Sequence, residues 1–274
     1  MDKQFWKAIQ ENDCDIPEGH TLKSLTPELL SFLGNTDPEL RDDLAYAILV
    51  EWVDHDLYTP DDLRQIIAEL SANLEVGIGE TGTDSVFLRT FSVLTLALIV
   101  YYDNKKSFLK SEEVEAILNK GLQYLAAEKD PRGYVPVKGW AHALAHTADL
   151  LLVLAKNRNT NATEHVRILD EIARKLTSST NWVYVHGEDD RLSRAVLTIF
   201  RRGLVSFFDV QEWLASFTGN WKGAWIDKGR TRAFSNLRNF IRSLYLQVAT
   251  EEDLPDQDEL EKMVLNAIQK MKPY

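Results

Sequence analysis

Cysteine is almost absent from this chain, since Cys14 is the only one among 274 residues. A single thiol excludes an intramolecular disulfide and a cluster of thiolate metal ligands. Cys14 lies in a polar stretch whose nearest histidine is His20, so a thiol nucleophile is not expected. The first residues, Met1-Asp2-Lys3, carry no apolar signal segment. These features predict a cytoplasmic protein.

Glycine, proline and strand-like patterns are also scarce. The chain has 13 glycines, 8 prolines and no long alternating runs rich in Val, Ile and Thr. Its longest apolar run, residues 93–102, is about half of what a bilayer crossing needs, so we expect no membrane span and no membrane partner. With 45% hydrophobic residues, the chain has ample material for a core. The composition predicts an all-α fold.

Common catalytic signatures are missing, and the net charge is strongly negative. The chain contains no GxGxxG, GxxxxGK[ST], GxSxG or HExxH motif. The net charge of −11 repels a phosphate backbone at long range. The segment from Arg194 to Arg242, however, contains nine basic residues and only three acidic ones. We expect this segment to contact acidic helices of its own chain, or of a second copy in a homo-oligomer, and not nucleic acid.

Several short motifs mark the starts of helices. Thr26-Pro27, Asp37-Pro38 and Thr59-Pro60 each place a capping side chain before a proline, and residues 161–164 and 256–259 have capping-box spacing. The periodicity between such motifs predicts helices over 38–54, 60–75, 84–103, 111–127, 139–156, 163–177, 188–204, 209–217, 231–249 and 257–271.

These helix starts recur at a regular interval. A helical hairpin recurs about every 45 residues, which is the period of HEAT and armadillo repeats. We therefore predict a single domain over residues 1–274 that forms a helical-hairpin solenoid, with a closed α/α toroid as the alternative. In either architecture the inner helices line a hollow. The segment 139–156 is the most apolar helix and is expected to be one of them.

A polar stripe crosses this apolar segment. His142, His146 and Asp149 are spaced i, i+4 and i+7, so they share one helical face. Buried polar groups need partners, which leaves three alternatives: an internal hydrogen-bond network, a bound small molecule, or a metal ion. The zinc-protease pattern fails because Ala143 follows the first histidine. We assign no metal ligand and no cofactor.

The loop before this helix carries charges of both signs. Glu128, Asp130 and Lys138 precede a helix N-terminus, where free amides can hold an anion. The alternative is a solvated turn with internal ion pairs.

Other polar residues occur within or at the start of predicted helices. Arg89 lies in an apolar helix and requires a carboxylate, for which Asp42 is the expected partner. Glu188 and Asp189 open a helix, where they either complement its dipole or face the histidines across the hollow.

Four aromatic residues, Trp213, Phe217, Trp221 and Trp225, recur at intervals of four near the basic segment. Two interpretations are open. The rings either form a binding shelf with the neighbouring cations or close the end of a core.

The run Lys138-Gly139-Trp140-Ala141-His142-Ala143, with Ala145-His146 and Ala148-Asp149-Leu150-Leu151 after it, resembles a family of bacterial proteins known only as domain of unknown function 2785. Arg41-Asp42, Arg89 and Glu188-Asp189 extend the resemblance over most of the chain. The resemblance implies a helical, repeat-like fold and no established activity.

Two functions are consistent with these residues. The first is a binding protein whose concave face holds a small polar ligand or a peptide. The second is a hydrolase that uses His142, His146 and Asp149, with or without a metal ion. The predicted ligand-binding residues are Arg89, Glu128, Asp130, Lys138, Trp140, His142, His146, Asp149, Glu188 and Asp189.

Overall fold

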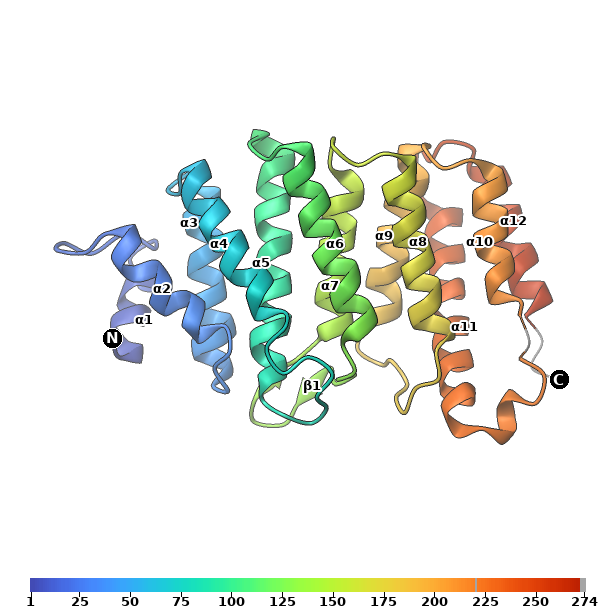
Figure 1. Cartoon of the computed structure of the whole chain (residues 1–274), viewed down its shortest axis with the longest axis horizontal. Coiled ribbons are helices and arrows are strands. Elements are labelled where there is room, and N and C mark those ends of the chain that lie inside the picture. Colours follow the sequence, from blue (N-terminus) through green and yellow to red (C-terminus); the bar gives the residue numbers. More distant parts are fainter. Residues whose placement is uncertain (220, 272–274) are drawn as a thin grey trace. The chain divides into compact units, whose positions relative to one another are not determined.

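The computed structural model describes residues 1–219 and 221–271, which fold almost entirely into helices (Figure 1). The predicted all-α class is confirmed. The helices are α1 (Lys3–Glu11), α2 (Leu22–Phe32), the π-helix η1 (Glu39–Tyr46), α3 (Ala47–Asp54), α4 (Pro60–Asn73), α5 (Ser85–Lys106), α6 (Ser111–Ala127), α7 (Ala143–Lys156), α8 (Ala162–Thr177), α9 (Glu188–Arg202), α10 (Phe207–Phe217), the 3₁₀ helix η2 (Ala224–Ile226), α11 (Lys228–Thr250) and α12 (Gln257–Lys270). The two-residue strands β1 (Tyr134–Val135) and β2 (Gly139–Trp140) form one antiparallel hairpin.

Most predicted helices are present at the expected positions. α6 has the predicted bounds, and α4, α8 and α12 differ from them by one or two residues. Two capping boxes explain part of this agreement. Thr59 and Asp62 exchange side-chain and backbone hydrogen bonds at the start of α4, and Asn161 and Glu164 do the same at α8.

The N-terminal predictions were partly wrong. The sequence analysis missed α1 and began a helix at Pro27, whereas α2 begins at Leu22 and keeps Pro27 inside. A capping box between Thr21 and Ser24 fixes the earlier start, and burial of leucines on both sides of Pro27 holds the helix together despite the lost backbone hydrogen bond. Asp256 also forms no side-chain cap, because its backbone is left-handed.

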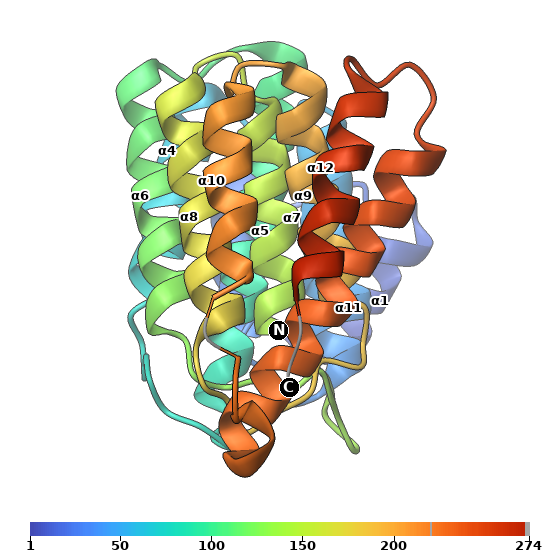
Figure 2. The same cartoon turned by 90° about the vertical axis from the view of Figure 1, so that its right-hand side faces the viewer.

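The chain divides into two compact units. Unit 1 comprises residues 1–109 and 127–150, and unit 2 comprises residues 110–126 and 151–274. In unit 1, α4 packs on α5, α3 packs on α5, and η1 contacts α1, α2 and α3. In unit 2, α10 packs on α8 and α12, and α11 packs on α9, α12 and α8 (Figures 1 and 2). Helices thus pair in sequence order within each unit; the expected single domain over 1–274 stays a prediction.

The core helix of unit 1 is α5. It spans 22 residues and, alone among the described helices, is long and apolar enough to cross a membrane. Most of it is nevertheless buried inside the protein, including Phe87, Phe91 and the polar Arg89. Such burial is typical of a core helix.

Candidate functional site

Arg89 is completely buried within α5 and belongs to a closed network. Its Nε and Nη2 donate to the two carboxylate oxygens of Glu128 over 2.6 and 3.2 Å. Its Nη1 donates to the carbonyls of residues 76–77 and to Ser85 Oγ. The predicted partner Asp42 was therefore wrong. The actual partner comes from the loop after α6, which helix periodicity does not place.

Glu128 and Asp130, in the loop after α6, connect this loop to the loop before α5. Glu128 Oε1 also accepts from the amides of Lys129 and Asp130. Asp130 accepts from Arg132 Nε at 2.8 Å and from the Gly82 amide at 2.9 Å. Arg89, Glu128 and Asp130 thus join residues 76–84 to residues 128–132 and form internal structural contacts, which was the alternative to a ligand site at the loop.

A second arginine, Arg41 on η1, is also completely buried. Its Nη1 donates to the Asn35 carbonyl at 2.6 Å, and its Nη2 donates to the carbonyls of Lys138 and Trp140 at 2.7 and 3.3 Å. Within residues 1–219 and 221–271, no carboxylate forms an ion pair with Arg41, and its Nε has no hydrogen-bond partner. Arg41 was not among the predicted site residues, although it lies in a largely apolar helix.

The guanidinium of Arg41 lies between aromatic rings. Its Cζ is 4.2 Å from the centroid of Phe87 and 4.8 Å from that of Phe91. Burial lowers the pKa of Arg41, while the charge of nearby Asp42 opposes that shift. Because an arginine keeps its proton at ordinary pH, a positive charge persists below the β-hairpin.

The hairpin presents an aromatic pair to solvent. Tyr134 and Trp140 lie opposite each other with ring centroids 5.0 Å apart, and they are 51% and 38% exposed. Only glycine fits at Gly139, where φ is 77° and an added Cβ would lie 2.7 Å from Pro38 Cβ. Lys138 forms an exposed ion pair with Asp84 at 2.7 Å. Of the predicted ligand residues, Trp140 is exposed, and Lys138, Asp149 and Asp189 are partly exposed.

The backbone at His142 differs from the prediction. α7 begins at Ala143, so His142 precedes the helix and adopts a left-handed φ of 54°. The hairpin sets this conformation, because the amides of Ala141 and His142 donate to the carbonyls of Gly133 and Arg132 at 2.7 and 3.1 Å. The His142 carbonyl then accepts from the His146 amide at 2.9 Å. The continuous helix 139–156 was therefore wrong at its start.

The two imidazoles nevertheless lie close together. The His142 and His146 rings have centroids 5.7 Å apart and an interplanar angle of 88°, and both residues are buried. His142 is also 4.2 Å from the Trp140 ring. His146 Nδ1 is 3.2 Å from the Thr90 carbonyl, to which it donates. Trp140, His142 and His146 form a continuous row of rings from the surface into unit 1.

A half-buried carboxylate, Asp42, lies next to Arg41 on the π-helix. Burial raises the pKa of Asp42, while the charge of Arg41 lowers it to a smaller extent. Tyr46, one turn later, contacts Phe91, whose ring is 5.3 Å from that of His146. π-Helices recur at functional sites. Asp42 was predicted only as a structural partner of Arg89, and the π-helix was not predicted, because the spacing of apolar residues does not distinguish a π-turn from an α-turn.

The other predicted carboxylates fall in different environments. Asp149 is half-buried on α7, one turn beyond His146. Glu188 and Asp189 belong to unit 2 and open α9, where Glu188 Oε2 accepts from the His186 amide at 2.8 Å. This arrangement agrees with dipole complementarity. A role for Glu188 or Asp189 opposite the histidines stays a prediction.

The described residues contain no group of three His, Cys, Asp or Glu side chains arranged to hold a metal ion. His142, His146 and Asp149 therefore do not form such a group. Cys14 is buried, and burial raises the pKa of its thiol, which disfavours the reactive thiolate. The hydrolase hypothesis stays a prediction.

The basic segment makes several contacts inside unit 2. Arg194 pairs with Asp190 at 2.9 Å, and Arg201 pairs with Glu251. Arg202 donates to three carbonyls in the region 155–160. These contacts agree with the expectation that the segment meets its own chain.

The four spaced aromatic residues have two different roles. Trp213, Phe217 and Trp221 are buried, which supports the core interpretation for these three rings. Trp225 is 68% exposed and does not contribute to the core.

Comparison with known sequences gives one relationship. The family described as "Protein of unknown function (DUF2785)" matches residues 74–246, which is more than half of the chain. This segment contains Arg89, the hairpin, both histidines and Glu188, but Arg41 and Asp42 precede it. Neither the curated proteins nor the solved structures yielded a significant match.

Proposed function

The chain belongs to this family of proteins of unknown function, and we propose that it is a binding protein that holds a small polar ligand or a peptide at the Trp140 corner of unit 1. The Trp140 corner comprises Tyr134, Trp140, His142 and His146, and the hairpin that carries it is anchored by Arg41. The observation that carries this proposal is the row of rings that leads from exposed Trp140 to buried His146.

The chemistry of the corner suits such a ligand. An exposed Trp offers a flat apolar face, and the buried imidazoles of His142 and His146 lie behind it. The guanidinium of Arg41, which forms no ion pair with any described residue, supplies a fixed positive charge below the hairpin, and half-buried Asp42 follows it on the same helix. A few polar groups of both signs beside aromatic rings are typical of ligand sites.

The backbone also supports a functional role. His142 is held at a positive φ by two hairpin hydrogen bonds, and Val137 in the same hairpin has a φ of 70°. Non-glycine residues in the left-handed region are uncommon and cluster at binding and active sites. Arg41 anchors the hairpin through two carbonyls and keeps the rings in place before a ligand binds.

We further propose that the paired helices belong to a HEAT-like solenoid rather than a closed toroid. The packing of α10 on α8 and of α11 on α9 in unit 2 supports this architecture, because solenoid repeats stack corresponding helices in two layers. Small-angle scattering tests the proposal, since an open solenoid and a closed ring of this length have different pair-distance distributions.

The binding proposal is tested by a thermal-shift screen of polar metabolites and short peptides, followed by calorimetric titration of each hit. Trp140→Ala should weaken binding by roughly tenfold or more, because a stacked ring is lost. Tyr101→Ala on α5 is the matched control, since Tyr101 is 44% exposed and lies in the same unit. Hits whose affinities are the same in the wild type and in Trp140→Ala would refute the site.

A further inference from the structure

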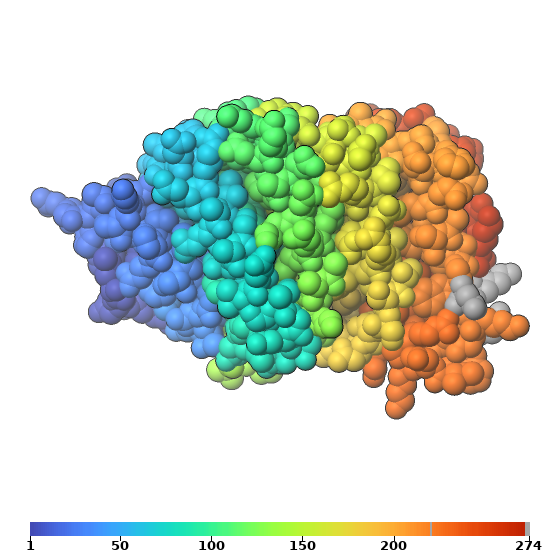
Figure 3. Space-filling view, viewed as in Figure 1, coloured from blue at the N-terminus to red at the C-terminus, as the bar shows by residue number. Residues whose placement is uncertain are grey.

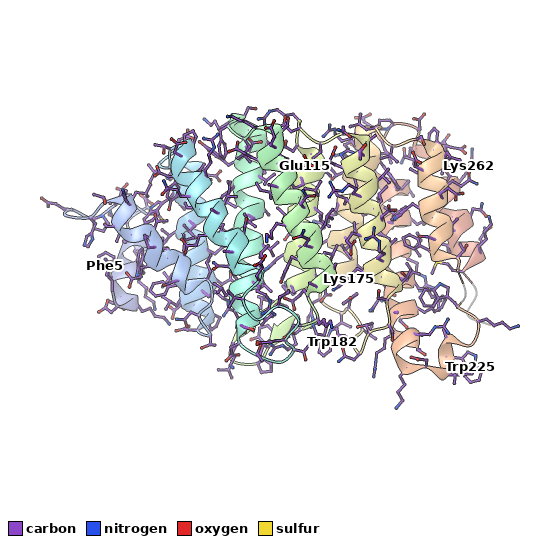
Figure 4. The ribbon with its side chains drawn as sticks, viewed as in Figure 1. Phe5, Glu115, Lys175, Trp182, Trp225 and Lys262 are labelled. Carbon is purple, nitrogen blue, oxygen red and sulfur yellow. The ribbon has the colours of Figure 1, made fainter. Side chains whose placement is uncertain are left out.

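A second surface, in unit 2, lies at the Trp225 loop, which we define as residues 221–232. Here Trp225 and Ile226 are adjacent and are 68% and 73% exposed. Both lie in the short turn η2, immediately before α11. Figures 1 and 2 show that this loop extends beyond the ends of α8 and α10, and Figure 4 shows the Trp225 side chain at its tip.

The loop is ordered by contacts of its own. The Trp221 indole donates to the Phe217 carbonyl at 2.7 Å, and Thr231 Oγ1 donates to the Ala224 carbonyl at 2.8 Å. Asp227 accepts from the Arg230 amide and caps α11. The exposed pair is thus presented by a built turn in which Trp221 and Ala224 face the core.

Positive charge surrounds the exposed pair. The loop carries Lys222, Lys228, Arg230 and Arg232 but only one acid, the capping Asp227. Lys222 and Lys228 are exposed and form no ion pair with any described residue. This charge exceeds what the loop itself neutralises, so its complement is an anionic surface.

We propose that the Trp225 loop docks the protein on the surface of an anionic lipid bilayer. Trp prefers the headgroup region, a neighbouring aliphatic side chain reaches the acyl boundary, and basic residues meet the anionic headgroups. A protein partner is less suitable, because a stable interface needs about 800 Å² per side and two side chains on a convex tip cover far less. Single-stranded nucleic acid is also less suitable, because its bases stack on successive aromatic rings in a groove and Ile226 has no ring.

This proposal departs from the expectation that the chain has no membrane partner. That expectation rested on the absence of a spanning segment, which has no bearing on a loop that lies on the surface. The binding should be weak and reversible, since it combines one small apolar insertion with a few surface charges, and the net charge of −11 repels an anionic surface at long range.

The test is flotation of the full chain with phosphatidylcholine vesicles that contain either no anionic lipid or about 30% phosphatidylserine. We expect flotation only with the anionic vesicles at low salt and a marked loss at about 0.5 M salt. Trp225→Ser with Ile226→Ser should lower the bound fraction roughly tenfold. Phe208→Ser is the matched control, because Phe208 on α10 is 70% exposed and should leave flotation unchanged.

Two double lysine variants test the contribution of the positive charge. Lys222→Gln with Lys228→Gln should also weaken flotation, whereas Lys262→Gln with Lys270→Gln on α12 should not; Figure 4 labels Lys262. Absence of flotation by the wild type, or equal flotation of the Trp225 and Ile226 variant, would overturn the proposal. So would a gel shift of single-stranded DNA that the Lys222 and Lys228 variant loses while no protein floats.

Discussion

Arg89 and Arg41 are both completely buried in unit 1, yet their surroundings differ. Arg89 meets the carboxylate of Glu128 in a two-point contact and is neutralised there. Arg41 donates only to carbonyls, packs against aromatic rings and forms no ion pair with any described residue, although Asp42 lies nearby. The first arginine closes a loop network, and the second leaves a positive field beside exposed Trp140. The role of a buried charged residue is therefore indicated mainly by the groups that contact its charge.

The polar residues around Arg89 differ in the same way from the histidines above Arg41. Glu128 and Asp130 have their oxygens occupied by arginines and backbone amides. His142 and His146 form a row that continues to the surface through Trp140. The first region should control stability, whereas the second should control binding.

The largest change in stability is expected when the carboxylate that pairs with Arg89 is removed. Glu128→Gln leaves an unneutralised guanidinium in the core, so we expect a loss of about 3–5 kcal/mol in the free energy of unfolding. Urea denaturation measures it. The control is Glu115→Gln, an exposed position on α6 that Figure 4 labels, where the change should stay within about 0.5 kcal/mol. A small loss for Glu128→Gln would mean that Arg89 does not depend on this partner.

A smaller loss is expected at Arg41. Arg41→Met removes the donors to three carbonyls, but Met fills the space between Phe87 and Phe91, so the cost should be about 2–3 kcal/mol. Because the charge of Arg41 lowers the pKa of Asp42, the same variant should raise that pKa further. NMR titration of the Asp42 carboxyl checks this. A lower pKa in the variant would contradict a positive field at the corner.

Asp42 itself gives a pH dependence of known sign. Burial raises its pKa above the ordinary value of 3.8, so the folded state binds the proton more tightly than the unfolded state. This contribution to stability is present below 3.8 and is lost as the pH rises through the folded pKa. Asp42→Asn should therefore gain stability relative to the wild type at neutral pH, by about 1 kcal/mol or less, and the gain should vanish in acid. Denaturation at several pH values tests this, and a gain that grows in acid would reverse the assignment.

The smallest effect is expected for the exposed ion pair of the hairpin. Lys138 and Asp84 are both exposed, so Lys138→Ala should cost no more than about 0.5 kcal/mol, and high salt should abolish the difference. Thermal unfolding at low and high salt measures it. A salt-independent loss above about 1 kcal/mol would show that the aliphatic part of Lys138 holds the hairpin.

The sequence predicts the elements better than their contacts. Thr59 and Asn161 reveal helix starts because a capping box is local, and the apolar spacing of 111–127 reveals α6. The hairpin before α7 escaped detection because its strands have two residues each, and His142 adopts its φ only through that hairpin.

In the candidate site too, local neighbours were predicted better than long-range contacts. The sequence identified His142 and His146 as neighbours, since their spacing is local, and it identified Trp140 as an adjacent residue. It did not find Glu128 opposite Arg89 or Arg41 below the hairpin. Both contacts join distant parts of the chain, and residue spacing carries no information on them.

The most direct test of the contrast is to measure the free energy of unfolding and the ligand affinity side by side for Glu128→Gln and Trp140→Ala. The account predicts a large loss of stability with unchanged affinity of the folded protein for Glu128→Gln. For Trp140→Ala it predicts a loss of stability below about 1 kcal/mol and a loss of affinity of roughly tenfold or more. A Trp140→Ala protein that is as unstable as Glu128→Gln and binds every ligand as tightly as the wild type would contradict it.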